Sequence, residues 1–430
     1  MEQVIKIGLL GLGTVGRGVY RILQENQESI EKRAGVKLEV KKILVRSFGK
    51  DRGINIPEGV LTTELTDITL DPEINIVVEV LGGIHPTLDY VLEALNQGKS
   101  VVTANKDMVA EYGQRLFMAA QKNNCDLLFE ASVAGGIPII RTLKQSLAGN
   151  HIEEVFGIIN GTTNYMLTKM TQDSSDFQEV LQEAQAKGYA ESDPTADVGG
   201  HDAARKIAIL ASIAFNTRVP LNQVYTEGIT KITADDIAYA NELGYVIKLL
   251  GIAKERQEGV EVRVHPTFIP KNHPLAAVGD VFNAVFVRGN AVGDTMFYGK
   301  GAGELPTASA VVADIMDAAR DIIRDVPGII GCTCFQEKPV LDIGETHSKY
   351  YIRLQVADKP GVLASIALVL GNKEVSLKSV IQKEATGKTA EVVLVTHRVL
   401  EQNVKDALMD IKQLSSVLEI ANLIRVEGEE

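Results

Sequence analysis

Short apolar runs rich in β-branched residues alternate with helical patterns over residues 1–130. The runs VIKIGLLG, VKKILV, INIVVEVL, SVVTANK and DLLFEAS have the length and composition of buried strands. Helical patterns separate them, beginning for example at Thr14 and Thr87. Strands that alternate with helices form a parallel sheet covered on both faces. The pattern therefore predicts an α/β domain over residues 1–130.

The pattern changes after residue 131. Longer helical patterns occupy four stretches, which are 137–148, 175–187, 201–214 and 233–250. Strand patterns such as EEVFGIIN and NAVFVRG lie between them. This mixture predicts a second, α+β domain over residues 131–342. An alternative is that residues 307–330 return to complete the first domain.

A polar stretch, GETHSK, precedes a third predicted domain at residues 349–430. Its runs YYIRLQVAD, VSLKSVIQKE, TAEVVLVTH and LEIANLIRVEG read as strands, and helical patterns begin at residues 361 and 401. The resulting order is β-α-β-β-α-β. This order predicts a ferredoxin-like domain.

Composition limits the partners of the chain. The formal net charge is −12, which repels nucleic acid and anionic membranes. The start MEQVIKIGLLG lacks a basic leader, and no apolar run is long enough to span a bilayer. We therefore expect a soluble, cytoplasmic protein with no nucleic-acid or membrane partner.

The cysteines and histidines give no sign of a transition-metal centre. Cys125, Cys332 and Cys334 are an odd set without the spacing of a zinc site. The seven histidines are scattered and form no HExxH motif. We expect the three thiols to be reduced and structural.

A glycine pattern follows the first predicted strand. Gly11, Gly13 and Gly16 form G-x-G-x-x-G between an apolar strand and a helix, which is the context of a Rossmann-type dinucleotide site. There the first glycine allows the tight turn, the second the approach of a pyrophosphate, and the third close packing of helix on strand. The alternative is a glycine-rich turn that binds nothing.

The end of the second predicted strand indicates which dinucleotide is preferred. An acidic residue at this position would hold a ribose 2′-hydroxyl, but the chain has Val45-Arg46-Ser47. Because arginine pairs with phosphate, Arg46 favours NADP, while NAD stays possible. The alternative is that Arg46 is an ordinary surface charge.

Six motifs carry a resemblance to a known family. They are GLGTVG, VVTANKD, FEASVAGGIPII, INGTTNY, GYAESDPTADVGGHDAARK and GKGAGELPT. In this order, over about the first 330 residues, the chain resembles homoserine dehydrogenase. The tail, with VADKPGVLASIA and VSLKSVIQK, resembles an ACT regulatory domain. No aspartate-kinase segment precedes these motifs, so the resemblance is to the monofunctional members.

The resemblance implies an NAD(P)H-dependent reduction of L-aspartate 4-semialdehyde to L-homoserine, in threonine, methionine and isoleucine biosynthesis. Residues 131–342 would then hold the substrate and form the dimer contact. It implies cofactor contacts from Gly11, Leu12, Gly13, Thr14, Val15, Gly16, Arg46, Thr103, Lys106, Gly188, Glu191 and Gly303. It implies substrate contacts from Lys106, Glu191, Asp202, Gly161, Thr162 and Thr163.

Two lysines and an aspartate are the predicted catalytic residues. Hydride transfer to an aldehyde leaves a developing alkoxide that needs a cation and a proton, and lysine supplies both. Lys206 lies four residues after Asp202, so the two share one helix face. By resemblance Lys206 is the proton donor, and Asp202 and Lys106 assist. The alternatives are a surface salt bridge and an ordinary loop lysine.

Acidic and hydroxyl groups fit the amino-acid end of the substrate. By resemblance Glu191 and Asp202 hold the amino group and hydroxyl end of homoserine, and Asp197 supports them or is a loop carboxylate. The turn that begins at Asn160 offers hydroxyls and N–H groups to the carboxylate. The alternative role of that turn is a helix cap, and both roles can coexist.

The resemblance also implies a structural sodium ion bound by main-chain carbonyls at Glu130, Val133, Gly135 and Ile137. Hard cations prefer oxygen ligands, and a glycine-containing turn aims successive carbonyls inward. The plain alternative is a loop between domains, and potassium is an alternative ion. The reaction itself needs no metal.

The ACT resemblance implies an amino-acid effector, for which threonine is expected, and a homo-oligomer, either dimer or tetramer. Pro360-Gly361 forms the turn that would leave N–H groups free for the effector. The alternative is a dimerisation module without a ligand. Two rival functions stay open: another amino-acid or sugar dehydrogenase, and a sensor that binds the cofactor without turnover.

Overall fold

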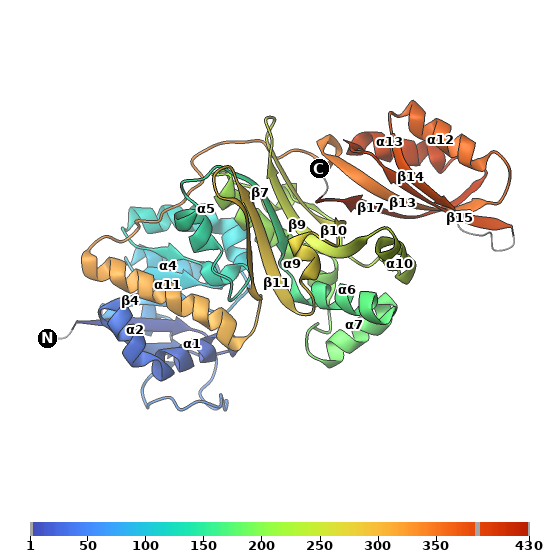
Figure 1. Ribbon diagram of the computed structural model, residues 1–430. Helices are drawn as coiled ribbons and strands as arrows, with labels where there is room; N and C mark the ends of the chain where they lie inside the picture. The colour runs from blue at the N-terminus through green and yellow to red at the C-terminus, as the bar shows by residue number, and fades with distance from the viewer. Residues whose placement is uncertain (1–2, 383–387, 429–430) are drawn as a thin grey trace. The chain divides into compact units, whose positions relative to one another are not determined.

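The computed structural model describes residues 3–382 and 388–428 (Figure 1). The described chain divides into two compact units. Unit 1 comprises residues 1–155, 208–221 and 283–337, and unit 2 comprises residues 156–207, 222–282 and 338–430. These two units differ from the three consecutive domains that the sequence predicts. The boundaries of those domains stay a prediction.

Unit 1 contains the predicted parallel sheet. Its strands are β1 (Val4–Leu10), β2 (Lys37–Leu44), β3 (Leu61–Thr62), β4 (Ile74–Glu79), β5 (Ser100–Thr103) and β6 (Leu127–Leu128). Their order in space is β3-β2-β1-β4-β5-β6, and every neighbouring pair is parallel. The chain reverses direction across the sheet between β1 and β4, which is the switch point of a Rossmann-type fold. The predicted fold class of this region is confirmed.

Helices cover both faces of this sheet because the strands present apolar side chains to each side. They are α1 (Thr14–Glu25), α2 (Gln27–Ala34), α3 (Thr66–Thr69), α4 (Thr87–Asn96), α5 (Lys106–Lys122) and α11 (Glu304–Arg324). One core joins Ile7 and Val78 of the sheet to α1, α2 and α11, and the other joins Leu10 and Val77 to α3, α4 and α5.

Helix α11 packs closely on α1, although about 280 residues separate them in the sequence. A Cβ atom on Gly18 would lie 2.7 Å from the carbonyl oxygen of Glu304, so only glycine allows this approach. The Glu304 carboxylate pairs with Arg17 at 3.4 Å and with Arg21 at 3.2 Å. The helical pattern near residue 307 thus lies with the N-terminal sheet in unit 1.

The rest of unit 1 is built from short elements and one hairpin. These are η1 (Glu130–Ser132), η2 (Thr142–Ser146), part of β7 (Ile152–Ile158), part of α9 (His201–Ala214), β11 (Phe282–Gly289) and β12 (Gly293–Lys300). The predicted helix at 137–148 is confirmed only in part. Its helical turns are confined to residues 140–146 and are wound as a π-helix over η2.

Unit 2 holds further helices and a long antiparallel strand pair. The helices are α6 (Gly161–Asp173), α7 (Phe177–Ala186), α8 (Thr195–Val198), part of α9, and α10 (Ala234–Glu242), and the strands are β8 (Tyr225–Thr226), β9 (Tyr245–Glu255) and β10 (Val260–Pro270). Strands β9 and β10 pair along their whole length. The predictions at 175–187 and 201–214 are confirmed to within two residues.

The predicted helix at 233–250 is wrong in its second half. Helix α10 ends at Glu242, Gly244 has a left-handed φ of 85°, and β9 begins at Tyr245. The run YVIKLLGIA is apolar with few interruptions, and nearly all of β9 is buried. A strand buried on both faces lacks the alternation that separates strand from helix in a sequence, so the periodicity was misleading here.

The C-terminal part of unit 2 has the predicted β-α-β-β-α-β order. Its elements are β13 (His347–Ala357), α12 (Val362–Asn372), β14 (Leu377–Gln382), β15 (Thr389–Thr396), β16 (Val399–Leu400), α13 (Glu401–Ile411) and β17 (Val417–Val426). The four long strands form an antiparallel sheet in the order β17-β13-β15-β14, with α12 and α13 on one face (Figure 1). This is the ferredoxin-like plan. The predicted strand residues 383 and 384 lie outside the described residues.

Strand β17 also joins this sheet to β10. The two strands are parallel and pair Thr267 with Arg425 and Phe268 with Val426. Two arginines are almost fully buried beside this junction, Arg263 on β10 and Arg425 on β17. Buried charges need partners because burial removes their hydration.

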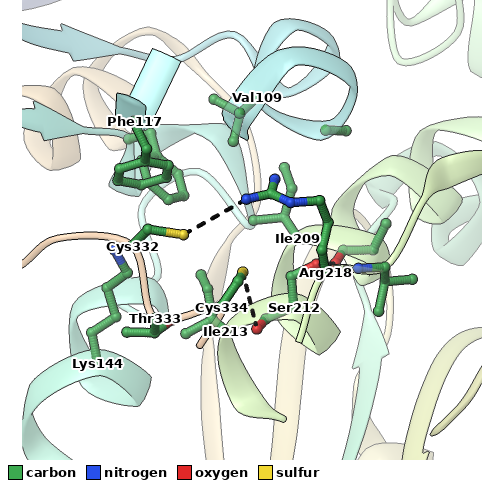
Figure 2. Close-up of a pocket in the computed structure, with 15 residues that line it drawn as sticks. Val109, Phe117, Lys144, Ile209, Ser212, Ile213, Arg218, Cys332, Thr333 and Cys334 are labelled. Atoms are coloured by element: carbon green, nitrogen blue, oxygen red, sulfur yellow. Dashed lines mark hydrogen bonds between the residues drawn. The ribbon is translucent and has the colours of Figure 1, made fainter. Parts of the chain in front are cut away.

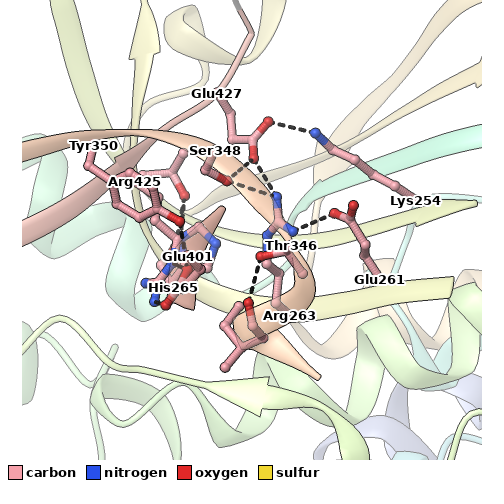
Figure 3. Close-up of polar contacts among 12 residues, drawn as sticks. Lys254, Glu261, Arg263, His265, Thr346, Ser348, Tyr350, Glu401, Arg425 and Glu427 are labelled. Atoms are coloured by element: carbon pink, nitrogen blue, oxygen red, sulfur yellow. Dashed lines mark hydrogen bonds and ion pairs between the residues drawn. The ribbon is translucent and has the colours of Figure 1, made fainter. Parts of the chain in front are cut away.

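Carboxylates supply those partners (Figure 3). Glu427 contacts Arg263 at 2.5 Å and Lys254 at 2.6 Å, and Glu261 contacts Arg263 at 2.5 Å. Arg425 binds both oxygens of the buried Glu401. The junction between β10 and the ferredoxin-like sheet is therefore stabilised by ionic contacts as well as by strand pairing.

Glu427 has a pKa lowered to about 2 from the ordinary 4.5. Burial by itself raises this pKa, but Lys254 and Arg263 together lower it by more. A carboxylate with a lowered native pKa stabilises the fold above its unfolded-state value, and the contribution is lost as the pH falls towards the native value. The contribution of Glu427 to stability is therefore lost as the pH falls from about 4.5 to about 2.

We expect Glu427→Gln to destabilise the chain by about 3–5 kcal/mol at pH 7, because the buried cations Lys254 and Arg263 lose a carboxylate that they share. The difference from the unsubstituted chain should shrink between pH 4.5 and pH 2. Urea denaturation across this range measures it. Glu419→Gln, an exposed position on the same strand, is the control and should change stability little. An equal loss at every pH would contradict the assigned role.

Candidate active site

The glycine loop between β1 and α1 leaves room for a ligand at one position. Gly11 has a left-handed φ of 104°, which favours glycine. A Cβ atom on Gly16 would lie 2.2 Å from the Gly11 carbonyl oxygen, so this glycine is needed for the turn itself. A Cβ atom on Gly13 would meet nothing within 4 Å. The chain therefore approaches itself at Gly16 and leaves open space at Gly13.

The start of α1 has the electrostatics of a phosphate site. Gly13 precedes the first helical residue, Thr14, and no acidic residue lies in the first turn. The helix N-terminus carries unsatisfied N–H groups and a positive partial charge. These groups fit a dinucleotide pyrophosphate. Of the other predicted loop residues, Leu12 is buried and Val15 is half-buried.

A buried carboxylate at the end of β4 organises the neighbouring loop. Glu79 is fully buried and accepts backbone N–H groups of Leu81 at 2.8 Å and Gly82 at 3.1 Å. The hydroxyl of Thr103, at the end of β5, donates to the other oxygen. Burial raises the pKa of Glu79 despite these donors. Glu79 thus ties together the ends of two strands at the edge where ligands of such sheets bind.

Glu79 was missed from the sequence. The signal was present, because a single acidic residue interrupts the apolar run INIVVEVL. Acidic residues are rarely buried without a partner, so an acid in a predicted core strand indicates a local polar role.

Lys106 stands at the first position of α5, directly after this edge. The side chain of Asn105 accepts from the N–H of Met108 at 3.1 Å and donates to the carbonyl of Gly83 at 2.6 Å. This cap fixes both the start of α5 and the loop after β4. Lys106 is half-buried. Thr103 and Lys106 therefore lie at the same edge as the glycine loop.

Two other predicted cofactor residues are at the surface of unit 1. Arg46 is exposed, two residues after the end of β2. Gly303 is exposed, has φ of 125°, and immediately precedes α11. The loop after Arg46 is held by Arg52, which donates to the carbonyls of Lys50 and Ser47 at 2.7 and 2.5 Å.

The predicted catalytic pair lies in unit 2 and makes a close contact. The ammonium nitrogen of Lys206 lies 2.6 Å from Oδ2 of Asp202 and 2.8 Å from the carbonyl oxygen of Ile159. The side chains are 13% and 11% exposed. A solvated salt bridge on a helix surface is far more exposed than this. The pair is therefore a partly buried ionic contact.

Asn160 connects this pair to the start of α6. Its amide nitrogen donates to Asp202 at 3.0 Å and to Asp197 at 2.6 Å. Its amide oxygen accepts from the N–H of Thr163 at 2.9 Å, which caps the helix. The side chain of Asn160 thus caps α6 and also contacts the two aspartates. Burial raises the pKa of Asp197, partly offset by the hydrogen bond from Asn160.

The remaining predicted substrate residues of unit 2 have mixed environments. Thr162 donates its hydroxyl to the carbonyl of Tyr189 at 2.6 Å, which joins the α6 start to the loop after α7. In that loop Gly188 has φ of 74° and Glu191 is exposed. The Glu191 carbonyl accepts from Gln185 at 3.0 Å, so its backbone is held while its carboxylate reaches the surface.

The predicted sodium-binding turn belongs to unit 1. The Glu130 carboxylate accepts the N–H groups of Ile140 at 2.8 Å and Arg141 at 2.7 Å, and burial raises its pKa. Ala134 and Gly135 both have a left-handed φ. Because the side chain is engaged in this way, a cation here would depend on main-chain oxygens. In residues 3–382 and 388–428, no cluster of three or more acidic, histidine or cysteine side chains is suited to hold a metal ion.

The predicted sites thus gather in two places. The glycine loop, Arg46, Thr103, Lys106, Gly303 and the 130–137 turn are in unit 1. Asp202, Lys206, Glu191, Gly188 and the 161–163 turn are in unit 2. No helix among the described residues is long and apolar enough to cross a membrane.

Three family models match successive parts of the chain. They are the homoserine dehydrogenase NAD-binding domain at residues 11–130, homoserine dehydrogenase at 138–316, and the ACT domain at 350–416. A homoserine dehydrogenase of Synechocystis is 48% identical over 433 residues, covering 99% of this chain and 100% of that protein.

Solved structures agree with these matches. A homoserine dehydrogenase from Thiobacillus denitrificans has a TM-score of 0.94 and 45% identity, and the match covers 99% of each chain. A hyperthermophilic archaeal homoserine dehydrogenase, solved in complex with NADPH, has a TM-score of 0.63 and 28% identity. That match covers 74% of this chain and 98% of the archaeal one.

The matching family models and relatives define an NAD(P)-dependent oxidoreductase that acts on a CH–OH group. The sequence identity to homoserine dehydrogenases extends over nearly the whole chain, so it indicates one family within this class. The chain belongs to the homoserine dehydrogenase family and carries a C-terminal ACT domain.

Proposed function

We propose that this chain reduces L-aspartate 4-semialdehyde to L-homoserine with NADPH as the preferred reductant, and that Lys206 donates the proton. The contact that carries the proposal is the ammonium of Lys206 held between Asp202 and the carbonyl of Ile159. The setting is the cytoplasm, in the synthesis of threonine, methionine and isoleucine.

The hydrogens of the Lys206 ammonium group support its role as proton donor. A lysine ammonium has three N–H donors. Asp202 and Ile159 accept two of them, at 2.6 and 2.8 Å. The third is left for the aldehyde oxygen, where negative charge develops as the carbonyl is reduced. Lys206 therefore stabilises that charge and then transfers its proton from Nζ to the oxygen.

The amino-acid end of the substrate carries an ammonium and a carboxylate, so it needs both acidic groups and hydrogen-bond donors. Glu191 and Asp202 would face its ammonium and hydroxyl groups, with Asp197 in support. Gly161, Thr162 and Thr163 would face its carboxylate with N–H and hydroxyl donors at the start of α6. Lys106 would contact substrate and cofactor together. The exposed carboxylate of Glu191 and the Asn160 contacts of Asp202 support this assignment.

The cofactor is held by the glycine loop. The open space at Gly13 and the acid-free first turn of α1 fit its pyrophosphate. Leu12, Thr14, Val15, Thr103, Gly188 and Gly303 complete the contacts proposed. When bound, the reduced nicotinamide supplies the hydride. Arg46 would pair with a 2′-phosphate, and the archaeal relative solved with NADPH supports this preference.

A sodium ion would bind the main-chain carbonyls of Glu130, Val133, Gly135 and Ile137. The paired left-handed residues at 134–135 and the engaged Glu130 side chain support a main-chain site. Its role would be structural. The chain would act as a homo-oligomer, either dimer or tetramer.

The ACT domain would bind threonine and lower the activity. Gly361 has φ of 85° in the turn before α12, and a Cβ atom there would meet nothing within 4 Å. This open turn supports an effector site. The buried ion pairs at the β10–β17 junction connect the ACT sheet to the rest of unit 2.

Replacing Arg46 with Ala should raise the KM for NADPH by about tenfold, because a charge-assisted contact to phosphate is lost. The KM for NADH should change little, since that cofactor lacks the 2′-phosphate. Steady-state oxidation of both cofactors with aspartate semialdehyde measures the two values. Lys32→Ala, on the exposed face of α2, controls for the lost charge. Equal changes for both cofactors would contradict the role of Arg46.

Threonine should inhibit homoserine oxidation by the full chain, and Gly361→Ala should weaken that inhibition without changing the uninhibited rate. The added methyl group strains the left-handed turn. Gly371→Ala, in α12 with equal open space, is the control and should keep the inhibition. The measurement compares the rate of homoserine oxidation with and without millimolar threonine for each variant. An unsubstituted chain insensitive to threonine would refute the effector assignment.

Replacing Lys206 with Ala should lower kcat by roughly 10²-fold to 10⁴-fold, the range of general-acid catalysis, and leave the affinity for NADPH nearly unchanged. Lys169→Ala is the matched control, because Lys169 also pairs with an aspartate four residues away, at 3.3 Å, but on the surface. That control should keep its kcat. Near-normal turnover in Lys206→Ala would show that another group supplies the proton.

A further inference from the structure

Two cysteines that the reaction does not use meet two cations in unit 1 (Figure 2). Cys332 and Cys334 follow α11 and are separated only by Thr333. They line a cavity of about 50 Å³ together with Lys144 and Arg218. Cys332 is exposed and Cys334 is half-buried, so reagents in solution reach the pair.

The sulfur of Cys332 is placed to carry a negative charge. A guanidinium nitrogen of Arg218 donates to it at 3.8 Å. The pKa of Cys332 is lowered, first by the neighbouring Cys334 thiol and then by the Cys334 backbone N–H, Arg218 and Lys144, although burial raises it. Thiolates are the reactive form of cysteine, and neighbouring cations favour them.

Cys334 has the opposite environment. Its thiol donates to the Ser212 carbonyl at 3.7 Å. The pKa of Cys334 is raised, first by the neighbouring Cys332 sulfur and then by burial. The pair is therefore unequal, with one sulfur favoured as thiolate and the other as thiol.

Lys144 holds this arrangement in place. Its ammonium donates to the carbonyl of Gly331 at 3.0 Å, directly before Cys332. It also lies 5.0 Å from the ring centre of Phe117 and 5.2 Å from that of Phe129. Burial lowers its pKa. The segment that carries the cysteines is thus tied to a fixed cation of unit 1.

We propose that Cys332 and Cys334 form a thiol–disulfide exchange site that reacts with small-molecule disulfides. The thiolate of Cys332 attacks one sulfur of the disulfide, so that one S–S bond forms, another breaks, and the leaving thiolate takes a proton from water. Cys334 then loses its proton to water and attacks the mixed disulfide at Cys332. A Cys332–Cys334 disulfide and two molecules of small thiol result, with two electrons passed from the protein to the reagent.

The third cysteine supplies an internal contrast. Cys125 is buried, and its sulfur lies near the carbonyls of Leu95 and Ala120. Burial raises its pKa to about 12. It is therefore expected to stay a thiol and to be unreactive. Under this proposal, only Cys125 keeps the purely structural role that the sequence predicts for all three thiols.

Oxidised glutathione added to the folded chain tests the exchange, with intact-mass and peptide mass spectrometry as the readout. The unsubstituted chain should lose two hydrogens and link Cys332 to Cys334. Cys334→Ser should instead keep one glutathionyl group on Cys332. Cys332→Ser should react at least tenfold more slowly, and Cys125→Ser should behave like the unsubstituted chain. A stable glutathionyl group on the unsubstituted chain, or no reaction, would overturn the proposal.

Alkylation by iodoacetamide across pH tests the thiolate independently. Cys332 should react with a pH midpoint at least one unit below the ordinary value of about 8.5. Arg218→Met should move the midpoint upward by removing the donated N–H, and Arg115→Met, on α5, is the charge control. A midpoint at or above 8.5 in a chain that is folded by circular dichroism would contradict the assigned roles of Arg218 and Cys332.

Discussion

The contact between Lys206 and Asp202 is the interaction on which the candidate active site depends. A lysine with 13% of its side chain exposed needs a carboxylate, since burial removes the hydration of its charge. Asp202 in turn accepts from Asn160, and the same asparagine caps α6. A change at Asn160 therefore alters both a contact of this ion pair and a helix terminus. The geometry of the proposed proton donor therefore depends on the same asparagine that starts α6.

In unit 1, a buried carboxylate and its hydrogen-bond partners organise the edge of the parallel sheet where ligands of such sheets bind. Glu79 is buried in the parallel sheet and is satisfied by the N–H groups of the loop after β4 and by Thr103. The Asn105 side chain extends this network to Gly83 and the start of α5. Polar groups buried in a sheet edge need such partners, and here the partners belong to the loops that would surround a cofactor. In the ACT sheet, buried arginines and carboxylates fix the junction with β10 in a comparable way.

The sequence was sufficient for the parallel sheet, the ferredoxin-like module and the pairing of Lys206 with Asp202, because periodicity and spacing along one element carry that information. It was not sufficient for β9, whose burial on both faces erased the alternation of a strand. It also did not reveal the packing of Gly18 against Glu304 or the contact of Arg218 with Cys332, since both join residues distant in the sequence. Glu79 was visible as an acid within an apolar run, but its partners were not.

The account as a whole rests on where the Lys206 nitrogen lies relative to the reacting oxygen. The most direct measurement is a crystal structure of the chain with NADP and homoserine both bound. The account predicts a distance of about 3 Å between Nζ of Lys206 and the homoserine hydroxyl oxygen, with Asp202 still in contact. A Lys206 side chain turned into solvent, with another donor on that oxygen, would contradict it.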